Sequence, residues 1–313
     1  MTNNLLKYKN MQIIKAKKLI WIDIKKPKEE DVEWLKKNFD LHPLVLKEIL
    51  PPIDYPKLEN YGNYLFITLF YPYFDRKTFS TLPFELDIIV GKNYLITLHY
   101  KDIVPLKAIF DRCNLYEDIR EEYTDEGAVE LLYRIIQGIL SACFPKLSHI
   151  KQNIDEIEKA IYRKEYQQTV NKISLVKRDI IGFQRIITPQ KLVLQKLVAE
   201  IPKIFGEKFI PYYHNLLSLY EQVRGILNTQ SQTLNALDST NQSLLTTRTN
   251  EIIKTLTIFS VIVFPLTLLA AIFGMNTTYL PFVGSPYDFW IISGIMVGAT
   301  IFMLAIFKLK KWI

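Results

Sequence analysis

Charge is almost missing from the C-terminal part of this sequence. The chain of 313 residues has 39 Lys or Arg and 32 Asp or Glu, yet only Asp288 is charged between Lys254 and Lys308. The ionisable chemistry is therefore confined almost entirely to the residues before this segment.

Cysteine is also scarce. Cys113 and Cys143 form neither a C-x-x-C pair nor a disulfide framework, so we expect two buried thiols in a reducing compartment. The N-terminus, MTNNLLKYKN, lacks an apolar h-region, and no cleaved signal peptide is visible.

Sequence motifs of enzymes and of nucleic-acid-binding proteins are missing as well. There is no P-loop, no H-E-x-x-H and no nucleophile elbow, and the four histidines have no metal-ligand spacing. The net charge of +7 comes without a compact Lys/Arg cluster interleaved with aromatic residues, so a nucleic-acid partner is not favoured. We predict a protein that is not an enzyme and has no organic cofactor.

Two long apolar runs are present instead. Residues 255–273 and 289–307 are each 19 residues long and uncharged, and a bilayer core takes roughly 20 helical residues. The alternative is a pair of buried core helices, but no comparable apolar surface elsewhere would cover both. We therefore predict two transmembrane spans.

Positive charge around these runs predicts their orientation. The connector 274–288 carries no Lys or Arg, whereas the tail carries Lys308, Lys310 and Lys311. The positive-inside rule then puts both termini in the cytoplasm and the connector outside. A cytosolic part of roughly 250 residues precedes the spans.

The first third of the cytosolic part has strand patterns. LIWIDI (19–24), NYLFITLFYPYF (63–74) and FELDIIVGKNYLITLHY (84–100) are apolar and β-rich, and Gly91-Lys92-Asn93 predicts a hairpin turn. KPKEEDVEWLKKNF predicts a helix, and from about residue 125 the pattern is helical, with breaks near Pro145, Pro189 and Pro202–Pro211. We predict a cytosolic α/β domain (1–125), a helical region with a stalk helix (126–254) and a transmembrane region (255–313).

The stalk helix is predicted to continue into the first span. Between Tyr212 and Gly274 the only helix breakers are Gly225 and Pro265, and apolar positions recur every three or four residues. About 53 residues at 1.5 Å each give a helix of about 80 Å.

One face of this helix combines polar or small residues with bulky apolar ones at an average step of 3.5, the period of a bundle seam. Copies around an axis would form polar rings and apolar constrictions, which gate by dewetting. The alternative is that the small and hydroxylated residues only pack membrane helices closely. The face consists of Asn250, Ile253, Leu256, Ser260, Phe264, Thr267 and Ala271.

The motif that ends the first span is specific. Gly274-Met275-Asn276 directly follows TLTIFSVIVFPLTLLAAIF, the tail reads FKLKKWI, and the N-terminal part contains WIDI and FDLHPLVLKEIL. With these motifs the sequence resembles the CorA family of magnesium transport proteins over nearly the whole chain.

The resemblance implies a membrane α+β fold that assembles as a homopentameric funnel in the cell (inner) membrane. The first span would line a pore along the seven-residue face, and the second would form an outer ring. Mg²⁺, the transported ion, loses its waters reluctantly, and a ring of Asn276 carboxamides would bind its hydration shell. Gly274 would let the backbone turn away from the helix end.

The sequence departs from the family pattern outside the motif. Leu280-Pro281-Phe282 replaces an acidic Met-Pro-Glu-like loop. Where relatives place acids between subunits to bind intracellular Mg²⁺, Glu48 alone remains, and Asp238 is a possible acid at the cytosolic mouth. We therefore expect gating without the usual intersubunit Mg²⁺ site. The replaced positions are Lys47, Gln137, Ser141, Ala142 and Asn215.

Two competing interpretations stay open. One keeps the architecture but changes the ion to Co²⁺, Ni²⁺ or Zn²⁺, although the predicted pore face has no His or Cys for soft metals. The other is a membrane-anchored scaffold whose cytosolic helices bind a partner.

Overall fold

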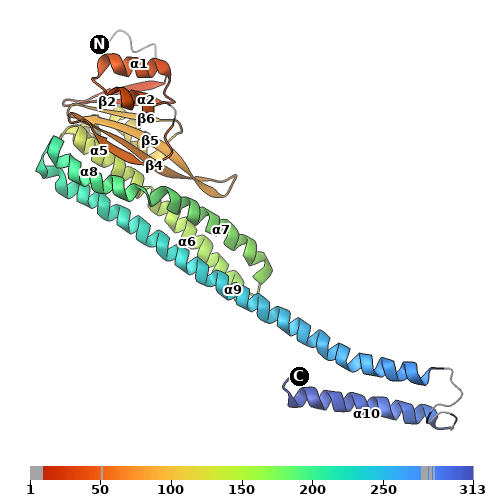
Figure 1. Cartoon of the computed structure of the whole chain (residues 1–313). Coiled ribbons are helices and arrows are strands. Elements are labelled where there is room, and N and C mark those ends of the chain that lie inside the picture. The colour runs from red at the N-terminus through yellow and green to blue at the C-terminus, as the bar shows by residue number, and fades with distance from the viewer. Residues whose placement is uncertain (1–9, 51, 276–280, 282–283, 285, 313) are drawn as a thin grey trace. The chain divides into compact units, whose positions relative to one another are not determined.

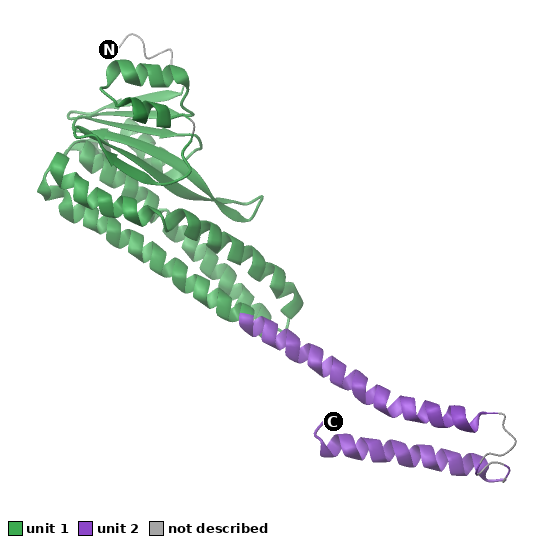
Figure 2. Ribbon diagram, in the orientation of Figure 1, with its two compact units in different colours: residues 1–238 green, residues 239–313 purple. Residues whose placement is uncertain are grey.

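The computed structural model describes residues 10–50, 52–275, 281, 284 and 286–312. The chain divides into two compact units, residues 1–238 and 239–313 (Figure 2). Each unit is described by itself below. The finer division at residues 125 and 254 stays a prediction.

A mixed β-sheet forms the centre of the first unit (Figure 1). Among the described residues it has six strands in the order β1-β2-β6-β5-β4-β3, and only the β2–β6 pair is parallel. The strands are β1 (Met11–Lys15), β2 (Ile20–Lys25), β3 (Lys57–Asn60), β4 (Tyr64–Asp75), β5 (Ser80–Gly91) and β6 (Tyr94–His99).

The two faces of the sheet bury different side chains because successive residues of a strand point to opposite faces. Ile22 and Ile24 of β2 join one apolar cluster with Leu35 of α1 (Glu29–Asn38) and Val45 of α2 (Pro43–Glu48). On the other face Trp21 packs edge-on against Phe110, with ring centroids 4.8 Å apart. The sheet is therefore covered by helices on both faces.

The strand predictions are confirmed. The three apolar runs became β2, β4 and the β5–β6 hairpin, whose turn lies at Gly91-Lys92-Asn93. Two short edge strands, β1 and β3, carried too few apolar residues to be predicted. The predicted helix at KPKEEDVEWLKKNF is α1, and the continuous helical part of the chain begins at Val104, about 20 residues earlier than expected.

The second half of this unit is helical (Figure 1). Breaks were predicted correctly at Ala142, just before Pro145, at Pro189, and at Gly206. A further break at residues 163–165 was missed; there Lys164 has a left-handed backbone with φ of 64°. The helices are α3 (Val104–Leu115), α4 (Glu117–Thr124), α5 (Ala128–Ser141), α6 (Cys143–Tyr162), α7 (Tyr166–Ile187) and α8 (Gln190–Phe205), followed by the 3₁₀ turn η2 (Glu207–Phe209).

Both cysteines are free and buried, as predicted. Burial raises the pKa of the Cys113 thiol to about 11 and that of Cys143 to about 12. At neutral pH both are therefore un-ionised and chemically quiet.

Helix α7 approaches the sheet closely at Gly182. A Cβ atom added there would lie 2.9 Å from the backbone oxygen of Thr81 in β5. We expect Gly182→Ala to destabilise the protein by about 1–3 kcal/mol, because the helix must move away from the strand. The measurement is thermal unfolding of the full-length protein in detergent.

Gly225 is the matched control for this prediction. It lies exposed in a helix, and a Cβ atom there meets no other atom within 4 Å. Gly225→Ala is expected to stabilise by about 0.5–1 kcal/mol, since alanine is the better helix former. A lower melting temperature for both variants would contradict the close-approach explanation.

Candidate functional site

Helix α9 (Ile210–Phe273) is continuous over 64 residues, which confirms the prediction that the stalk helix runs into the first apolar segment. Helix α10 (Asp288–Leu309) covers the second segment. The residues from Ser239 onward in α9 belong to the same compact unit as α10.

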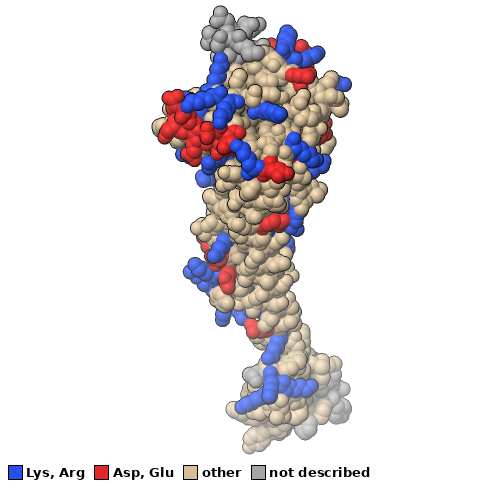
Figure 3. All heavy atoms as spheres, turned by 90° about the vertical axis from the view of Figure 1, so that its left-hand side faces the viewer, with Lys and Arg blue, Asp and Glu red and all other residues tan. Residues whose placement is uncertain are grey.

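Three helical stretches among the described residues are long and apolar enough to cross a membrane: 128–162 (α5 with α6), 207–273 (η2 with α9) and 288–309 (α10). The most apolar window of the first is 56% buried inside the fold, whereas the windows of the other two are 0% buried. The first stretch therefore uses its apolar side chains as core. The other two leave theirs exposed, as lipid-facing or subunit-facing helices do. The face of the molecule in Figure 3 has mixed charges over the first unit and few over the second.

The predicted pore face is the uncovered side of α9. Half-buried side chains of the apolar segment recur at Ile258, Ile262, Leu266, Leu269 and Phe273, and Thr257 is half-buried as well. At about 100° per residue, the row of five lies about 175° around the helix from the middle of the seven-residue face. The seven residues are exposed apart from Ser260, which is half-buried. Within one chain, then, the side of α9 opposite the predicted pore face is the partly covered one.

The two hydroxyl groups on this face have a defined orientation. Ser260 Oγ donates to the backbone oxygen of Leu256 at 2.9 Å, and Thr267 Oγ1 donates to that of Val263 at 2.8 Å. A hydroxyl has one hydrogen and two lone pairs. Because the hydrogen is used inside the helix, each oxygen presents lone pairs outward, which suits a hydrated cation.

The end of α9 is held tightly at Gly274 and Met275. The Gly274 N–H donates to Ala270 O at 2.9 Å, and the Met275 N–H donates to Ile272 O at 3.2 Å. Gly274 directly follows the last helical residue, and it does not have a left-handed backbone. Its Cβ would instead lie 3.1 Å from Ala270 O, so close approach is the constraint. Asn276 and the loop positions Leu280 and Phe282 lie outside the described residues.

Glu48, the remaining acid of the expected cytosolic metal site, is already paired. Its Oε2 accepts a hydrogen bond from Lys57 Nζ, which also lies 3.6 Å from Glu59 and 4.8 Å from the centroid of the Phe66 ring. The Lys57 side chain is only 9% exposed. A tethered ammonium therefore takes the place that a cation would need beside Glu48.

Two of the positions where the family's acids are replaced, Gln137 and Asn215, belong to a neutral network. Gln137 Nε2 donates to the Tyr133 hydroxyl at 3.0 Å, and that hydroxyl donates to Asn215 Oδ1 at 3.2 Å. Sequence reasoning missed the central tyrosine. Lys47 is exposed on α2, Ser141 ends α5 and Ala142 follows it.

Asp238 is also paired, with Lys177 Nζ at 3.3 Å. In the described part of the chain, no group of three or more His, Cys, Asp or Glu side chains is arranged to hold a metal ion. Hard cations need several charged oxygen ligands, so the single chain offers no strong site of this kind there.

This pairing gives a testable prediction. We expect Glu48→Ala to leave the effect of millimolar Mg²⁺ on trypsin digestion unchanged, because Lys57 and not a metal neutralises Glu48. The measurement is the digestion rate of the full-length protein with and without Mg²⁺, with Glu33→Ala on α1 as control. Strong protection by Mg²⁺ that Glu48→Ala alone removes would contradict it.

Comparisons with known proteins agree with this arrangement. A cobalt/magnesium transport protein CorA from Thermotoga maritima is 28% identical over 94% of this chain and 83% of its own length. The protein of the same name from Methanocaldococcus jannaschii is 25% identical over 95% of this chain and 92% of its own length. A putative metal ion transporter from Bacillus subtilis, YfjQ, is 26% identical over 93% of this chain and 89% of its own length.

The fold also matches solved structures. The complete structure of the CorA magnesium transporter from M. jannaschii superposes with a TM-score of 0.81 at 23% identity, over 96% of this chain and 93% of that one. The full-length CmaX protein superposes with a TM-score of 0.73 at 16% identity, over 99% of this chain and 93% of that one. The family described as CorA-like Mg²⁺ transporter protein matches residues 16–310, and this chain belongs to that family.

Proposed function

We propose that the protein is a passive channel for hydrated Mg²⁺, formed by five copies of this chain in the cell (inner) membrane. The seven-residue face of α9 lines the pore, α10 forms an outer ring, and a ring of Asn276 carboxamides selects the ion. Both termini lie in the cytoplasm. The observation that carries the proposal is the uncovered polar and apolar face of α9, opposite the half-buried row.

Asn276 is proposed to bind the hydration shell of the ion, not the bare ion. Carboxamide oxygens accept hydrogen bonds from coordinated water without the strong attraction of a carboxylate ring. Mg²⁺ can then enter and also leave. The oxygen lone pairs of Ser260 and Thr267 provide further acceptors along the pore.

The membrane potential supplies the driving force. A divalent cation that moves down about 100 mV gains about 4.6 kcal/mol, twice the value for a single charge. This free energy suffices for uptake without nucleotide hydrolysis. The sequence has no P-loop that would bind a nucleotide.

A second candidate ion is Co²⁺, because two relatives are named cobalt/magnesium transport proteins. Hydrated divalent ions of similar size would meet the same oxygen acceptors. The absence of His and Cys from the seven-residue face disfavours a path selective for soft metals.

The test is divalent-ion uptake into proteoliposomes under an imposed potential, with Mg²⁺, Co²⁺, Ni²⁺ and Zn²⁺ in turn. Wild type is compared with Asn276→Ala and with Asn63→Ala, an exposed asparagine in the turn between β3 and β4. We expect Asn276→Ala alone to lower Mg²⁺ uptake and selectivity. Uptake insensitive to Asn276→Ala would reject the carboxamide ring, and no flux of any divalent ion would favour a scaffold.

A further inference from the structure

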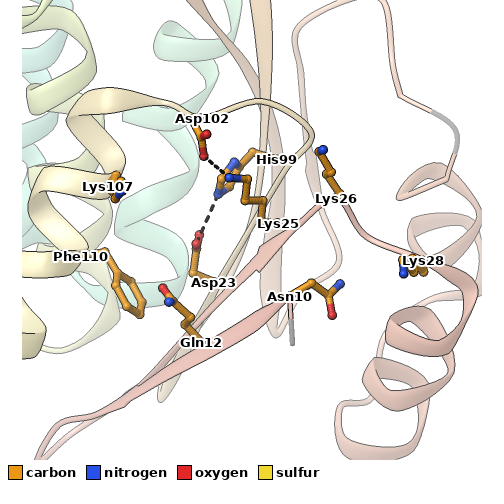
Figure 4. A pocket seen from close by; sticks show the side chains of 10 residues that line it. All are labelled: Asn10, Gln12, Asp23, Lys25, Lys26, Lys28, His99, Asp102, Lys107 and Phe110. Atoms are coloured by element: carbon orange, nitrogen blue, oxygen red, sulfur yellow. Dashed lines mark hydrogen bonds and ion pairs between the residues drawn. The ribbon is translucent and has the colours of Figure 1, made fainter. Parts of the chain in front are cut away.

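The first unit has a pocket of about 400 Å³ where β1, β2 and β6 meet the start of α3 (Figure 4). Ligand pockets commonly measure about 300–1,000 Å³. Four lysines line this pocket, together with His99 and two aspartates. Neither the ion pathway nor the Glu48 pair uses any of these groups.

Both aspartates of the pocket are already neutralised (Figure 4). Asp102 Oδ1 lies 2.5 Å from Lys25 Nζ. Asp23 accepts hydrogen bonds from Thr97 Oγ1 and, at 3.3 Å, from His99 Nε2. Their negative charge therefore contributes little to the field inside the pocket.

The surroundings of His99 favour its charged form. It is 6% exposed, and its Nδ1 lies 2.7 Å from the backbone oxygen of Lys101 while Nε2 faces Asp23. A carbonyl and a carboxylate only accept hydrogen bonds, so imidazolium, with a proton on each ring nitrogen, matches both partners. Burial opposes this charge, but the hydrogen bond to Asp23 and its charge prevail, and the pKa of His99 is raised above 6.5.

Lys26, Lys28 and Lys107 remain as positive groups with no carboxylate within 4 Å in the described part of the chain. Lys26 also has a left-handed backbone, with φ of 53°, and its N–H donates to His99 O at 2.8 Å. A non-glycine residue in this conformation is strained, and such strain clusters at functional sites. The backbone here turns at the rim of the pocket, at the end of β2.

We propose that this pocket binds a small anion that carries two or more phosphate groups, of the kind found in pyrophosphate and nucleoside diphosphates. Its two carboxylates are already paired with Lys25 and His99, which leaves the three lysines named above to face an anion. Lysine binds phosphate as a point charge, and three lysines around one pocket match several phosphate charges. The exposed amide of Gln12 adds a polar group at the wall.

The experiment is isothermal titration of the full-length protein in detergent, without Mg²⁺, with inorganic phosphate, pyrophosphate and ADP. We expect pyrophosphate and ADP to bind more tightly than phosphate, and all binding to weaken with salt. The triple variant Lys26→Gln, Lys28→Gln, Lys107→Gln should weaken ADP binding at least about tenfold, because charge-assisted contacts are lost.

The matched control removes three charges from elsewhere in the same unit. Lys36, Lys37 and Lys92 are exposed and do not line the pocket, and their replacement by Gln should change binding less than about twofold. Thermal unfolding verifies that both variants fold. No binding of any probe, ADP no tighter than phosphate, or equal loss in both triple variants would overturn the proposal. The result is independent of whether the protein transports ions.

Discussion

Leu256→Ser should raise Mg²⁺ flux through the protein by about tenfold or more, because a ring of serines would let water fill an apolar constriction of the proposed pore. Leu256 is 63% exposed and lies on the uncovered face of α9. A wetted constriction no longer presents a desolvation barrier to a hydrated ion. The measurement is Mg²⁺ entry into proteoliposomes at a fixed potential.

Leu269 provides the matched control. It belongs to the half-buried row on the opposite side of α9 and lies about 140° around the helix from Leu256, at 100° per residue. Leu269→Ser changes the same side chain to the same replacement outside the proposed pore, so flux should stay near the wild-type value. Equal increases in the two variants would mean that α9 does not line the pore with the seven-residue face.

The sequence was sufficient to predict the elements whose signal is local. Nineteen uncharged residues ending at Phe273 became the last part of α9, and the second run became α10. The β5–β6 hairpin followed from two apolar runs around Gly91-Lys92-Asn93. In each case the apolar composition that burial or a lipid environment requires lies within one short segment. The element can therefore be predicted from that segment alone.

Elements with a weak local signal were harder to predict. Strands β1 and β3 are short edge strands that depend on pairing with β2 and β4. The helix break at Lys164 has no nearby glycine or proline to mark it. Local propensity is weak in such segments, and tertiary contacts decide their conformation.

The same distinction applies to the candidate site, where some features can be predicted from the sequence and others depend on the folded structure. The period of the seven-residue face is visible in the sequence, but the orientation of the Ser260 and Thr267 hydroxyls depends on backbone acceptors four residues earlier. The pairing of Glu48 with Lys57 depends on how the chain folds back between α2 and β3. The sequence therefore left Glu48 as a possible metal ligand until the structure showed its partner.

A half-buried lysine whose ammonium nitrogen is buried gives the second large effect. Lys146 on α6 lies 4.1 Å from the centroid of the Tyr71 ring, and its Nζ has no hydrogen-bond partner in the part of the chain that the structure describes. Burial lowers its pKa from 10.5 to about 8. The folded protein must still hold a desolvated ammonium at neutral pH, at a cost that the aromatic ring only partly offsets.

Lys146→Met is expected to stabilise the protein at pH 7 by about 2–3 kcal/mol, given the lowered pKa of Lys146. Between pH 8 and 10.5 the unfolded chain binds more protons at this lysine than the folded protein does. Wild-type stability therefore rises with pH in that window. The gain from Lys146→Met should be full below pH 8 and shrink as pH rises, as measured by thermal unfolding at several pH values.

Lys151→Met is the control for this effect. Lys151 is exposed on the same helix, so its replacement should change stability by less than about 0.5 kcal/mol at any pH. The other lysines are the same in wild type and in both variants, so their contribution to the pH dependence cancels when the stabilities of the two variants are compared. A Lys146→Met protein no more stable than Lys151→Met at pH 7 would show that the Lys146 ammonium is well solvated or well paired. A gain that did not shrink above pH 8 would assign the effect to methionine packing instead of charge.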